Sequence, residues 1–254
     1  MKRLILIGTK NNCNEQKRAG FTLVELLIVL TIVAVLAVAT VLILNPAEIL
    51  KKSRDTQRMS DLSSIKSAIA LYLSTVSTPY LGGAATDAGC VDSAVSANSR
   101  LYVSIAEATT DITDATPPAD PDGAAVGVGW TQLAASWGQV ATVAELGEVD
   151  GTGWIPVKIS DTTGGAAISN FPIDPNQSVT AAGVTNADRT YRYACRPSTA
   201  TLTSPPSTFE LDANLESSYY TSGTTNSEAN DGGNNAILYE VGTDLSILPA
   251  SDDF

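Results

Sequence analysis

The chain contains no histidine among its 254 residues. Histidine is the side chain that changes charge near neutral pH, so the commonest general base and a frequent metal ligand are both absent. The usual Ser or Cys triads need such a base, and no glycine-rich segment has the spacing of a phosphate-binding loop. These absences predict that the protein is not an enzyme.

Basic residues are scarce over most of the chain. Lys and Arg number 15 against 27 acidic residues, which gives a formal net charge of -12. The basic residues beyond Lys66 are Arg100, Lys158, Arg189, Arg192 and Arg196. A surface this acidic repels nucleic-acid phosphates, so we expect no specific nucleic-acid partner.

One long apolar run stands out against this composition. Between Phe21 and Leu44 the only charge is Glu25, and after it the only polar side chains are two threonines. A helix of 24 residues is about 36 Å long, enough to cross a hydrocarbon core of about 30 Å. The run therefore predicts a helix that can span a membrane.

The residues before the run distinguish it from a secretory signal. Such a signal has its small-residue cleavage site after a shorter apolar region. Here Ala19 and Gly20 precede the apolar run and directly follow Lys17 and Arg18. Cleavage at Gly20 would remove the charged leader and leave the apolar helix on the mature chain. The net charge of residues 1–20 is +4, so their removal would change the net charge of the chain from -12 to -16.

Glu25 is unusual inside such a helix. A carboxylate at the centre of a membrane helix costs roughly 2.5–3.5 kcal/mol, so such acids usually have a partner. If the chain begins at Phe21, its new amino group lies four residues away, and neighbouring copies offer the same cation. Glu25 could then be neutralised by its own terminus or a neighbour's. The alternative is an interfacial carboxylate solvated by headgroups.

These residues resemble a known signal. Gly20 to Glu25, which read Gly-Phe-Thr-Leu-Val-Glu, are similar to the cleavage and methylation motif of type IV prepilins and of the pseudopilins of type II secretion. The resemblance implies that a membrane-embedded prepilin peptidase cuts between Gly20 and Phe21 and methylates Phe21. It also implies that Glu25 is needed for ordered assembly.

The order of elements in the rest of the chain predicts an α+β head, and the resemblance implies a type IV pilin-like fold, in which a long N-terminal helix packs on a small antiparallel β-sheet. The expected parts are a cleaved leader (1–20), a transmembrane or filament-core helix (21–44), the amphipathic half of the long helix (45–76), and an acidic globular head (77–254) with a variable loop (about 77–153) and a sheet (about 154–245). The predicted sheet (about 154–245) resembles the sheet region of major pilins and pseudopilins.

The element pattern refines this expectation. Asn45 and Pro46 predict a break, followed by a helix to about Ser74. One apolar stripe recurs along this helix at spacings of three and four residues: Met59, Leu62, Ile65, Ile69 and Leu73. Strands are predicted at 101–105, 154–159, 191–195, 208–213 and 237–241, and residues 130–143 form either a short helix or an irregular segment.

Basic residues near the start of this second helix have several possible partners. Lys51, Lys52, Arg54 and Arg58 would lie just outside the bilayer. They could contact lipid headgroups or acids on the next subunit, or form a solvated face.

Two cysteines would remain after loss of the leader. Cys13 lies in the leader, which leaves Cys90 and Cys195 in an exported head. An oxidising compartment favours one disulfide between them, closing a loop of about 106 residues and contributing about 4–5 kcal/mol in the chain-entropy model. Spacing alone does not show that they meet, and two buried thiols are the alternative.

Calcium is the only ligand for which the sequence offers candidates. Asp231 and Asp244 lie in a C-terminal region with Gly232 and Gly233, and they are weak candidate ligands for Ca²⁺. The spacing does not match an EF-hand, so a solvated acidic turn is the competing interpretation. We expect no other cofactor or metal.

The resemblance implies a structural subunit of a type IV pilus-like surface filament. The basic leader would keep the N-terminus in the cytoplasm, and the single-pass subunit would await assembly in the cytoplasmic membrane. Its partners would be the prepilin peptidase, an inner-membrane assembly platform and like subunits that form a homo-oligomeric filament. One alternative is a pseudopilin of a type II secretion system. Another is a membrane-anchored extracellular binding domain. Adhesion, motility and DNA uptake are all compatible with the first.

Overall fold

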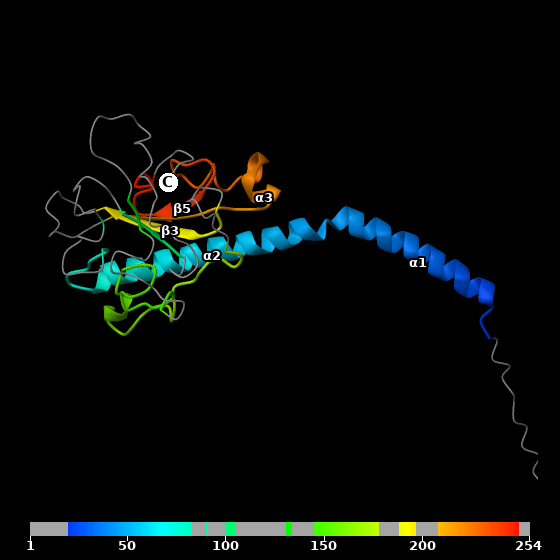
Figure 1. Ribbon diagram of the computed structural model, residues 1–254, viewed down its shortest axis with the longest axis horizontal. Coiled ribbons are helices and arrows are strands. Elements are labelled where there is room, and N and C mark those ends of the chain that lie inside the picture. Colours follow the sequence, from blue (N-terminus) through cyan, green and yellow to red (C-terminus); the bar gives the residue numbers. More distant parts are fainter. Residues whose placement is uncertain are drawn as a thin grey trace, which may run out of the picture. The chain divides into compact units, whose positions relative to one another are not determined.

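The computed structural model describes residues 20–82, 90, 100–104, 131–133, 145–177, 188–196 and 208–248. The chain divides into two compact units, Met1–Pro46 and Ala47–Phe254. The first contains helix α1 (Leu23–Leu44), and the second contains helix α2 from its second residue onward together with the head (Figure 1). We describe each unit by itself.

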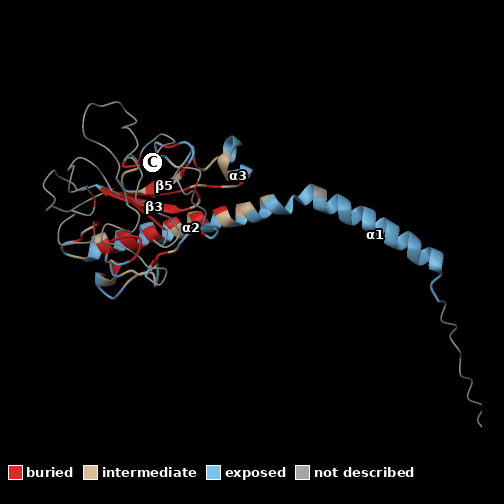
Figure 2. Cartoon of the chain, in the orientation of Figure 1, coloured by how far each residue is buried: buried red, intermediate tan, exposed pale blue. Residues whose placement is uncertain are grey.

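Helix α1 is apolar on all sides. Every side chain of α1 whose exposure is described lies on the surface (Figure 2). The hydroxyl groups of Thr31 and Thr40 donate hydrogen bonds to the backbone carbonyl oxygens of Ile28 and Leu36, at 2.8 and 2.5 Å. The polar groups of both threonines are therefore satisfied within the helix, as a hydrocarbon environment requires.

The predicted break between the two helices is confirmed. Asn45 ends α1 in the left-handed region, at φ 38° and ψ 73°, which Asn adopts more readily than most residues. Helix α2 (Pro46–Thr75) begins at the next residue. Proline suits this first helical position because its missing N–H has no partner there in any helix.

Helix α2 buries one face against the head. Leu62, Ile65 and Ile69 of the predicted stripe are fully buried, which confirms its centre. Met59 and Leu73 are only half-buried at its margins. The other buried residues of the helix are Asp55, Arg58, Ala68 and Tyr72.

The head contains a five-stranded sheet in the order β2-β1-β3-β4-β5. The strands are β1 (Arg100–Val103), β2 (Thr131–Leu133), β3 (Tyr191–Arg196), β4 (Thr208–Ala213) and β5 (Tyr239–Gly242). The neighbours β1, β3, β4 and β5 are antiparallel, whereas the edge strand β2 runs parallel to β1. The short helices are α3 (Ser218–Thr221) and the 3₁₀ turns η3 (Ile159–Asp161) and η4 (Gly223–Thr225).

The two faces of the sheet differ in chemistry. Because side chains alternate along a strand, Tyr191, Tyr193 and Cys195 of β3 share one face with Phe209 and Leu211 of β4. These residues belong to the same hydrophobic core as Leu62, Ile65 and Ile69 of α2. Arg192, Glu210, Asp212 and Glu240 lie on the other face and are also buried. An apolar helix followed by this mainly antiparallel sheet forms the α+β architecture that the resemblance predicted.

Three predictions about the head need correction. Residues 154–159 do not form a strand: Trp154, Ile155 and Val157 are all buried in an irregular segment, and Pro156 has no N–H for a strand ladder. Residues 131–133 form β2, so this part of 130–143 is neither helical nor irregular, and the rest of that range lies outside the described residues. Strands β1 and β2 both belong to the sheet, so the range assigned to the variable loop (about 77–153) contains two strands of the sheet, of which the one at 101–105 was predicted.

The strands at 191–195 and 208–213 are confirmed as a pair, and β1 matches most of the predicted strand at 101–105. The last strand starts two residues later than expected, at Tyr239. After it, residues 243–248 continue along the head, where Ile247 and Leu248 are buried.

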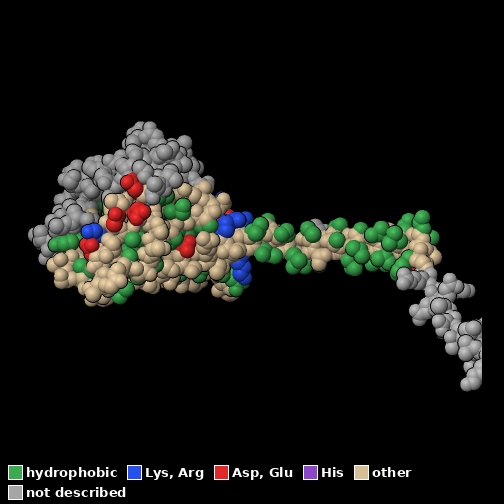
Figure 3. Space-filling view, turned by 90° about the horizontal axis from the view of Figure 1, so that it is seen from below, with side chains coloured by type: hydrophobic (Ala, Val, Ile, Leu, Met, Phe, Trp, Pro, Cys, Tyr) green, Lys and Arg blue, Asp and Glu red, His purple; other side chains and the backbone are tan. Residues whose placement is uncertain are grey.

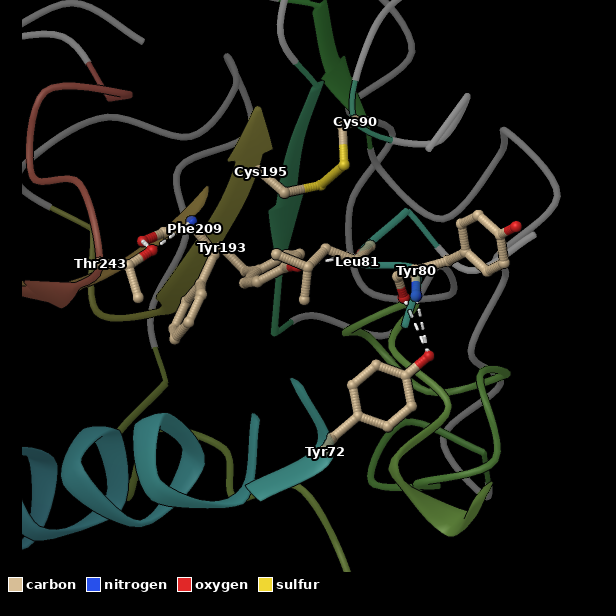
Figure 4. Close-up of a disulfide and its surroundings, with 8 residues drawn as sticks. All are labelled: Tyr72, Tyr80, Leu81, Cys90, Tyr193, Cys195, Phe209 and Thr243. Carbon is tan, nitrogen blue, oxygen red and sulfur yellow. Dashed lines mark hydrogen bonds between the residues drawn. A yellow bond between two sulfur atoms is a disulfide. The ribbon is translucent and has the colours of Figure 1, made fainter. Parts of the chain in front are cut away.

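A disulfide joins the two cysteines that the sequence offered as a possible pair. Cys90 and Cys195 are bonded, and both are fully buried (Figure 4). Nearby, the Tyr193 hydroxyl donates to the Leu81 carbonyl at 3.0 Å, and the Tyr72 hydroxyl accepts from the Tyr80 N–H at 3.0 Å. These bonds link the end of α2 and the segment after it to β3.

Candidate functional site

The first candidate site is the segment that precedes α1. Gly20, Phe21 and Thr22 are not helical, and Thr22 is extended at φ -78° and ψ 149°. Apart from the glycine and its chain neighbours, no described residue has an atom within 4 Å of the position that a Cβ would take on Gly20, and Phe21 is 83% exposed. The bond between Gly20 and Phe21 is therefore open and lies outside the helix, as access by a peptidase requires.

Thr22 fixes where the helix starts. Its side-chain oxygen accepts the Glu25 N–H at 3.2 Å, and its carbonyl accepts the Leu26 N–H at 3.2 Å. This is the bonding of a helix N-cap, for which threonine is a favoured residue. Sequence reasoning did not assign a role to Thr22, although a threonine followed three residues later by Glu is a known helix-start signal.

Glu25 lies in the first turn of α1 with its side chain exposed. Within the described part of the chain, no cation pairs with its carboxylate, while its surroundings on the helix are apolar. Its position near the helix N-terminus is favourable for a negative charge. An amino group created at Phe21 would lie four residues away in sequence, so the expected ion-pair partner remains a prediction.

The apolar length of α1 fits a bilayer. The stretch Leu23–Val41 has a mean hydropathy of 2.8, and none of it is buried. A helix that is hydrophobic all round needs either a membrane or other helices to cover it. A shallow apolar groove also runs along this helix, lined by Leu23, Leu26, Leu27, Leu30, Thr31 and Ala34.

The second candidate site is a buried charge cluster centred on Arg58. Its Nε and Nη2 donate to the two carboxylate oxygens of Asp174 at 2.6 and 3.0 Å. Its Nη1 donates to Asp55 at 2.7 Å, and its Nη2 lies 2.7 Å from a Glu216 oxygen. All four side chains are at most 4% exposed, so Arg58 is not on the solvated face considered from the sequence.

The cluster fastens α2 to two distant segments. Asp55 also accepts the backbone N–H groups of Glu216 and Ser217, at 2.9 and 2.7 Å, and Arg54 forms two bonds of 2.9 Å to Glu216. Burial alone would raise the pKa of Glu216, but the bonds from Arg54 and Arg58 outweigh it and hold the pKa at about 2. The cluster is therefore a structural clamp of ionised groups.

A sequence signal for this clamp existed and was missed. Residues 55 and 58 precede the buried residues 62, 65, 69 and 72 at the same spacings of three and four. Asp55 and Arg58 thus continue the buried face by one turn. The apolar pattern alone placed Met59 there instead, because a charged pair on a buried face can be recognised only once its partners are known.

The third candidate is the polar face of the sheet. Glu210 accepts the N–H groups of Ile247 and Leu248 at 2.8 and 2.7 Å, which holds the segment 243–248 on this face. Burial raises the pKa of Glu210 strongly, and a hydrogen bond shared with the Glu240 carboxyl raises it further. Burial therefore favours a proton held by this pair of carboxyl groups. Glu210 and Glu240 are 0 and 2% exposed, so this pair supports the fold and is out of a substrate's reach.

The two candidate calcium ligands, Asp231 and Asp244, form hydrogen bonds with nearby groups of the head. Asp231 accepts the N–H groups of Gly233 and Glu240 at 2.9 and 2.7 Å. Asp244 accepts from Ser246 and lies 3.8 Å from Arg196. Within the described ranges, no group of three or more His, Cys, Asp or Glu side chains could hold a metal ion. The calcium site therefore stays a prediction from sequence.

Comparison with known protein families gives one match. Residues 16–41 match the model of the prokaryotic N-terminal methylation motif, which is the prepilin and pseudopilin signal motif. Neither the curated proteins nor the solved structures gave a match to the chain. The matched range contains Gly20, Phe21, Thr22 and Glu25, so the motif and the first candidate site coincide.

Proposed function

The methylation motif indicates a type IV pilin-like or pseudopilin-like protein, and from that premise we propose that the chain is the pilin subunit of a type IV pilus-like surface filament. The motif implies cleavage by a prepilin peptidase and assembly into a filament or membrane complex. It also implies a structural protein without enzymatic activity. The finer steps below are our proposal.

Cleavage after Gly20 frees the amino group of Phe21, which is then methylated. Helix α1 holds the subunit in the cytoplasmic membrane, with the leader on the cytoplasmic side and the head outside. An assembly platform in that membrane then moves the subunit into the filament, where α1 helices cover one another. The observation that carries this proposal is that α1 is apolar on every side, with one carboxylate near the cleavage site that pairs with no cation among the described residues.

Glu25 has a defined task in this scheme. In the low-dielectric interior of a helix bundle, an unpaired carboxylate is strongly unfavourable, and a cation nearby removes most of that cost. The Phe21 amino group of a neighbouring subunit supplies the cation only when the two helices are in register. Glu25 therefore selects one stagger between adjacent helices.

The test is the substitution Glu25→Ala in the full chain. Processing after Gly20 should continue, because the cleavage site is outside the helix, but few or no filaments should form. Glu25→Asp keeps the charge and should retain part of the assembly. Thr31→Val is a matched control on the same helix, since it removes a polar group that is already bonded internally. Abundant filaments from Glu25→Ala would refute the register argument.

A pseudopilin of a type II secretion system is the second candidate, because the matched motif is shared by both groups. A pseudopilin would form a short periplasmic assembly that moves secreted proteins and would leave no surface fibre. Deletion of the gene distinguishes the two functions. Loss of surface fibres with normal protein secretion supports the pilin, whereas loss of secretion with normal fibres supports the pseudopilin.

A further inference from the structure

The start of α2 carries an exposed apolar and basic surface that the filament scheme does not use. Ile49 and Leu50 are 54 and 60% exposed, and Lys51 and Lys52 follow them directly. Tyr219 of α3, 44% exposed, lies against the same turn of the helix. We call Ile49, Leu50, Lys51, Lys52 and Tyr219 the collar.

Tyr219 is held in the collar by specific bonds. Glu48 of α2 accepts both the N–H and the hydroxyl of Ser218, at 2.5 and 2.7 Å. The Lys52 ammonium lies 3.4 Å from the centroid of the Tyr219 ring, a cation–π contact. The chain beyond β4 therefore returns to the start of α2, and it places an aromatic ring beside Lys52, which is distant in sequence.

The charges around the collar are sorted by depth. Glu216 is 4% exposed, whereas its partners Arg54 and Arg189 are 29 and 37% exposed. Glu48 also lies at the surface here, but Lys51, Lys52, Arg54 and Arg189 outnumber it, so this end of the head has a basic surface. Figure 3 shows most of the visible Lys and Arg side chains gathered at the end of the head where α2 begins, with a further basic side chain near the opposite end and most of the visible Asp and Glu side chains between them. The rest of the head is acidic, so the basic end is a local feature.

The length of α1 limits how far the collar lies from the membrane. Its 22 residues span about 33 Å, slightly more than a hydrocarbon core of about 30 Å. The headgroup layer adds about 5–7 Å on each side, and helical residues rise about 1.5 Å each. Residues 46–52 cover about 10 Å of helix, so in a subunit anchored through α1 this stretch lies at most about that far from the end of the membrane helix, whichever way α2 runs.

We propose that the collar docks on anionic lipid headgroups of the membrane that holds α1, and so keeps the head of the unassembled subunit against the bilayer surface. This proposal rests on the membrane anchoring in the proposed function. Ile49 and Leu50 enter the boundary between headgroups and acyl chains. Lys51 and Lys52 meet lipid phosphates, and Tyr219 occupies the interface that favours aromatic rings with a polar end. Assembly must then release the collar from the bilayer.

The chemistry favours lipid over a second subunit as the occupant. An acidic patch on a neighbouring head would satisfy the lysines, but it offers nothing for Ile49 and Leu50. An anionic bilayer surface offers both phosphates and apolar boundary, and the end of α1 already brings it to the collar.

The test uses the full chain in nanodiscs that hold one copy each, with zwitterionic lipid alone or mixed with anionic phosphatidylglycerol. The readout is hydrogen–deuterium exchange at the amides of residues 218–222. In anionic discs at low salt, exchange should slow by roughly thirty-fold, the factor that two lysines provide near such a surface. High salt should remove this protection.

The double substitution Lys51→Ser with Lys52→Ser should abolish the difference between the two lipids. Lys66→Ser is the matched control, because Lys66 is an exposed lysine on the same helix but outside the collar. Equal exchange in both lipids, or protection that survives the double substitution, overturns the proposal. Protection that appears only when several copies share a disc, whatever the lipid, also overturns it and assigns the collar to contacts between subunits.

This readout is independent of filament formation. Filaments lost in Glu25→Ala with collar protection intact would support both proposals. A chain that does not enter the discs would overturn membrane anchoring and the collar together, whereas a chain that enters without lipid-dependent protection overturns the collar alone.

Discussion

Replacement of Arg58 by methionine tests the buried clamp, on which the position of α2 in the head depends. Arg58 donates to Asp174 through two atoms, to Asp55 through a third, and lies 2.7 Å from Glu216. Methionine is long and apolar, so it occupies part of the same space without a charge. The substitution leaves three carboxylates where the cation had been.

The cost follows from which partners remain. Asp55 keeps its bonds from two backbone N–H groups, and Glu216 keeps Arg54. Among the described residues, the Asn176 N–H, at 2.8 Å, is the remaining donor to Asp174, whose side chain is fully buried. Removing one partner of a buried ion pair costs about 3–5 kcal/mol. For a unit of this size, about 2–4 °C per kcal/mol gives a fall in Tm of roughly 6–20 °C.

Thermal unfolding of the full chain in detergent, followed by near-UV circular dichroism, measures this fall. The double substitution Arg58→Met with Asp174→Asn removes the stranded carboxylate and should recover at least about 1 kcal/mol of the loss. A fall in Tm below about 2 °C for Arg58→Met would refute the clamp. So would a double variant no more stable than the single one, because the cost would then not come from an unpaired charge.

Two further predictions concern the head. The pKa of Glu210, which shares a hydrogen bond with Glu240, is raised in the folded protein. Its contribution to folding stability is therefore complete below its unfolded pKa near 4.5 and is lost as the pH rises toward the folded pKa. Glu216, with its pKa lowered to about 2, contributes above pH 4.5 and loses that contribution as pH falls toward 2. Tm should therefore be highest near pH 4.5–5.5. The substitution Glu210→Gln should reduce the fall in Tm at pH values above this maximum. A Tm that rises steadily to pH 8 would contradict this sign. Joint replacement of Cys90 and Cys195 by serine should cost about 4–5 kcal/mol, seen as a lower urea midpoint, and a midpoint equal to the wild type would show that the cross-link is not stabilising.

The sequence predicted the parts of this fold that depend on local pattern. The apolar run predicts α1, and the Asn45-Pro46 pair predicts where it ends, because the preferences of both residues act within one turn. The strands at 191–195 and 208–213 alternate clearly, and they pair as predicted. The motif at Gly20 to Glu25 is likewise local, so the candidate site at the N-terminus needed no tertiary information.

The remaining features depend on contacts between distant segments. Arg58 is buried because Asp174 and Glu216 meet it, and neither partner can be recognised from the helix alone. The segment around Pro156 has a strand-like pattern, yet Trp154, Ile155 and Val157 are buried in irregular chain, because Pro156 has no N–H for a strand ladder. Tyr219 joins Lys52 only through the return of the chain beyond β4. Periodicity reports burial on one element, and it does not report which elements meet.

The central claim is that the mature chain begins at Phe21 and assembles through α1. Electron microscopy of sheared surface material, combined with mass spectrometry of the purified fibres, tests it most directly. We predict fibres composed of this chain, with an N-terminal peptide that starts at a methylated Phe21. Fibres that lack the chain, or a chain in the membrane that keeps residues 1–20 and never assembles, would contradict the account.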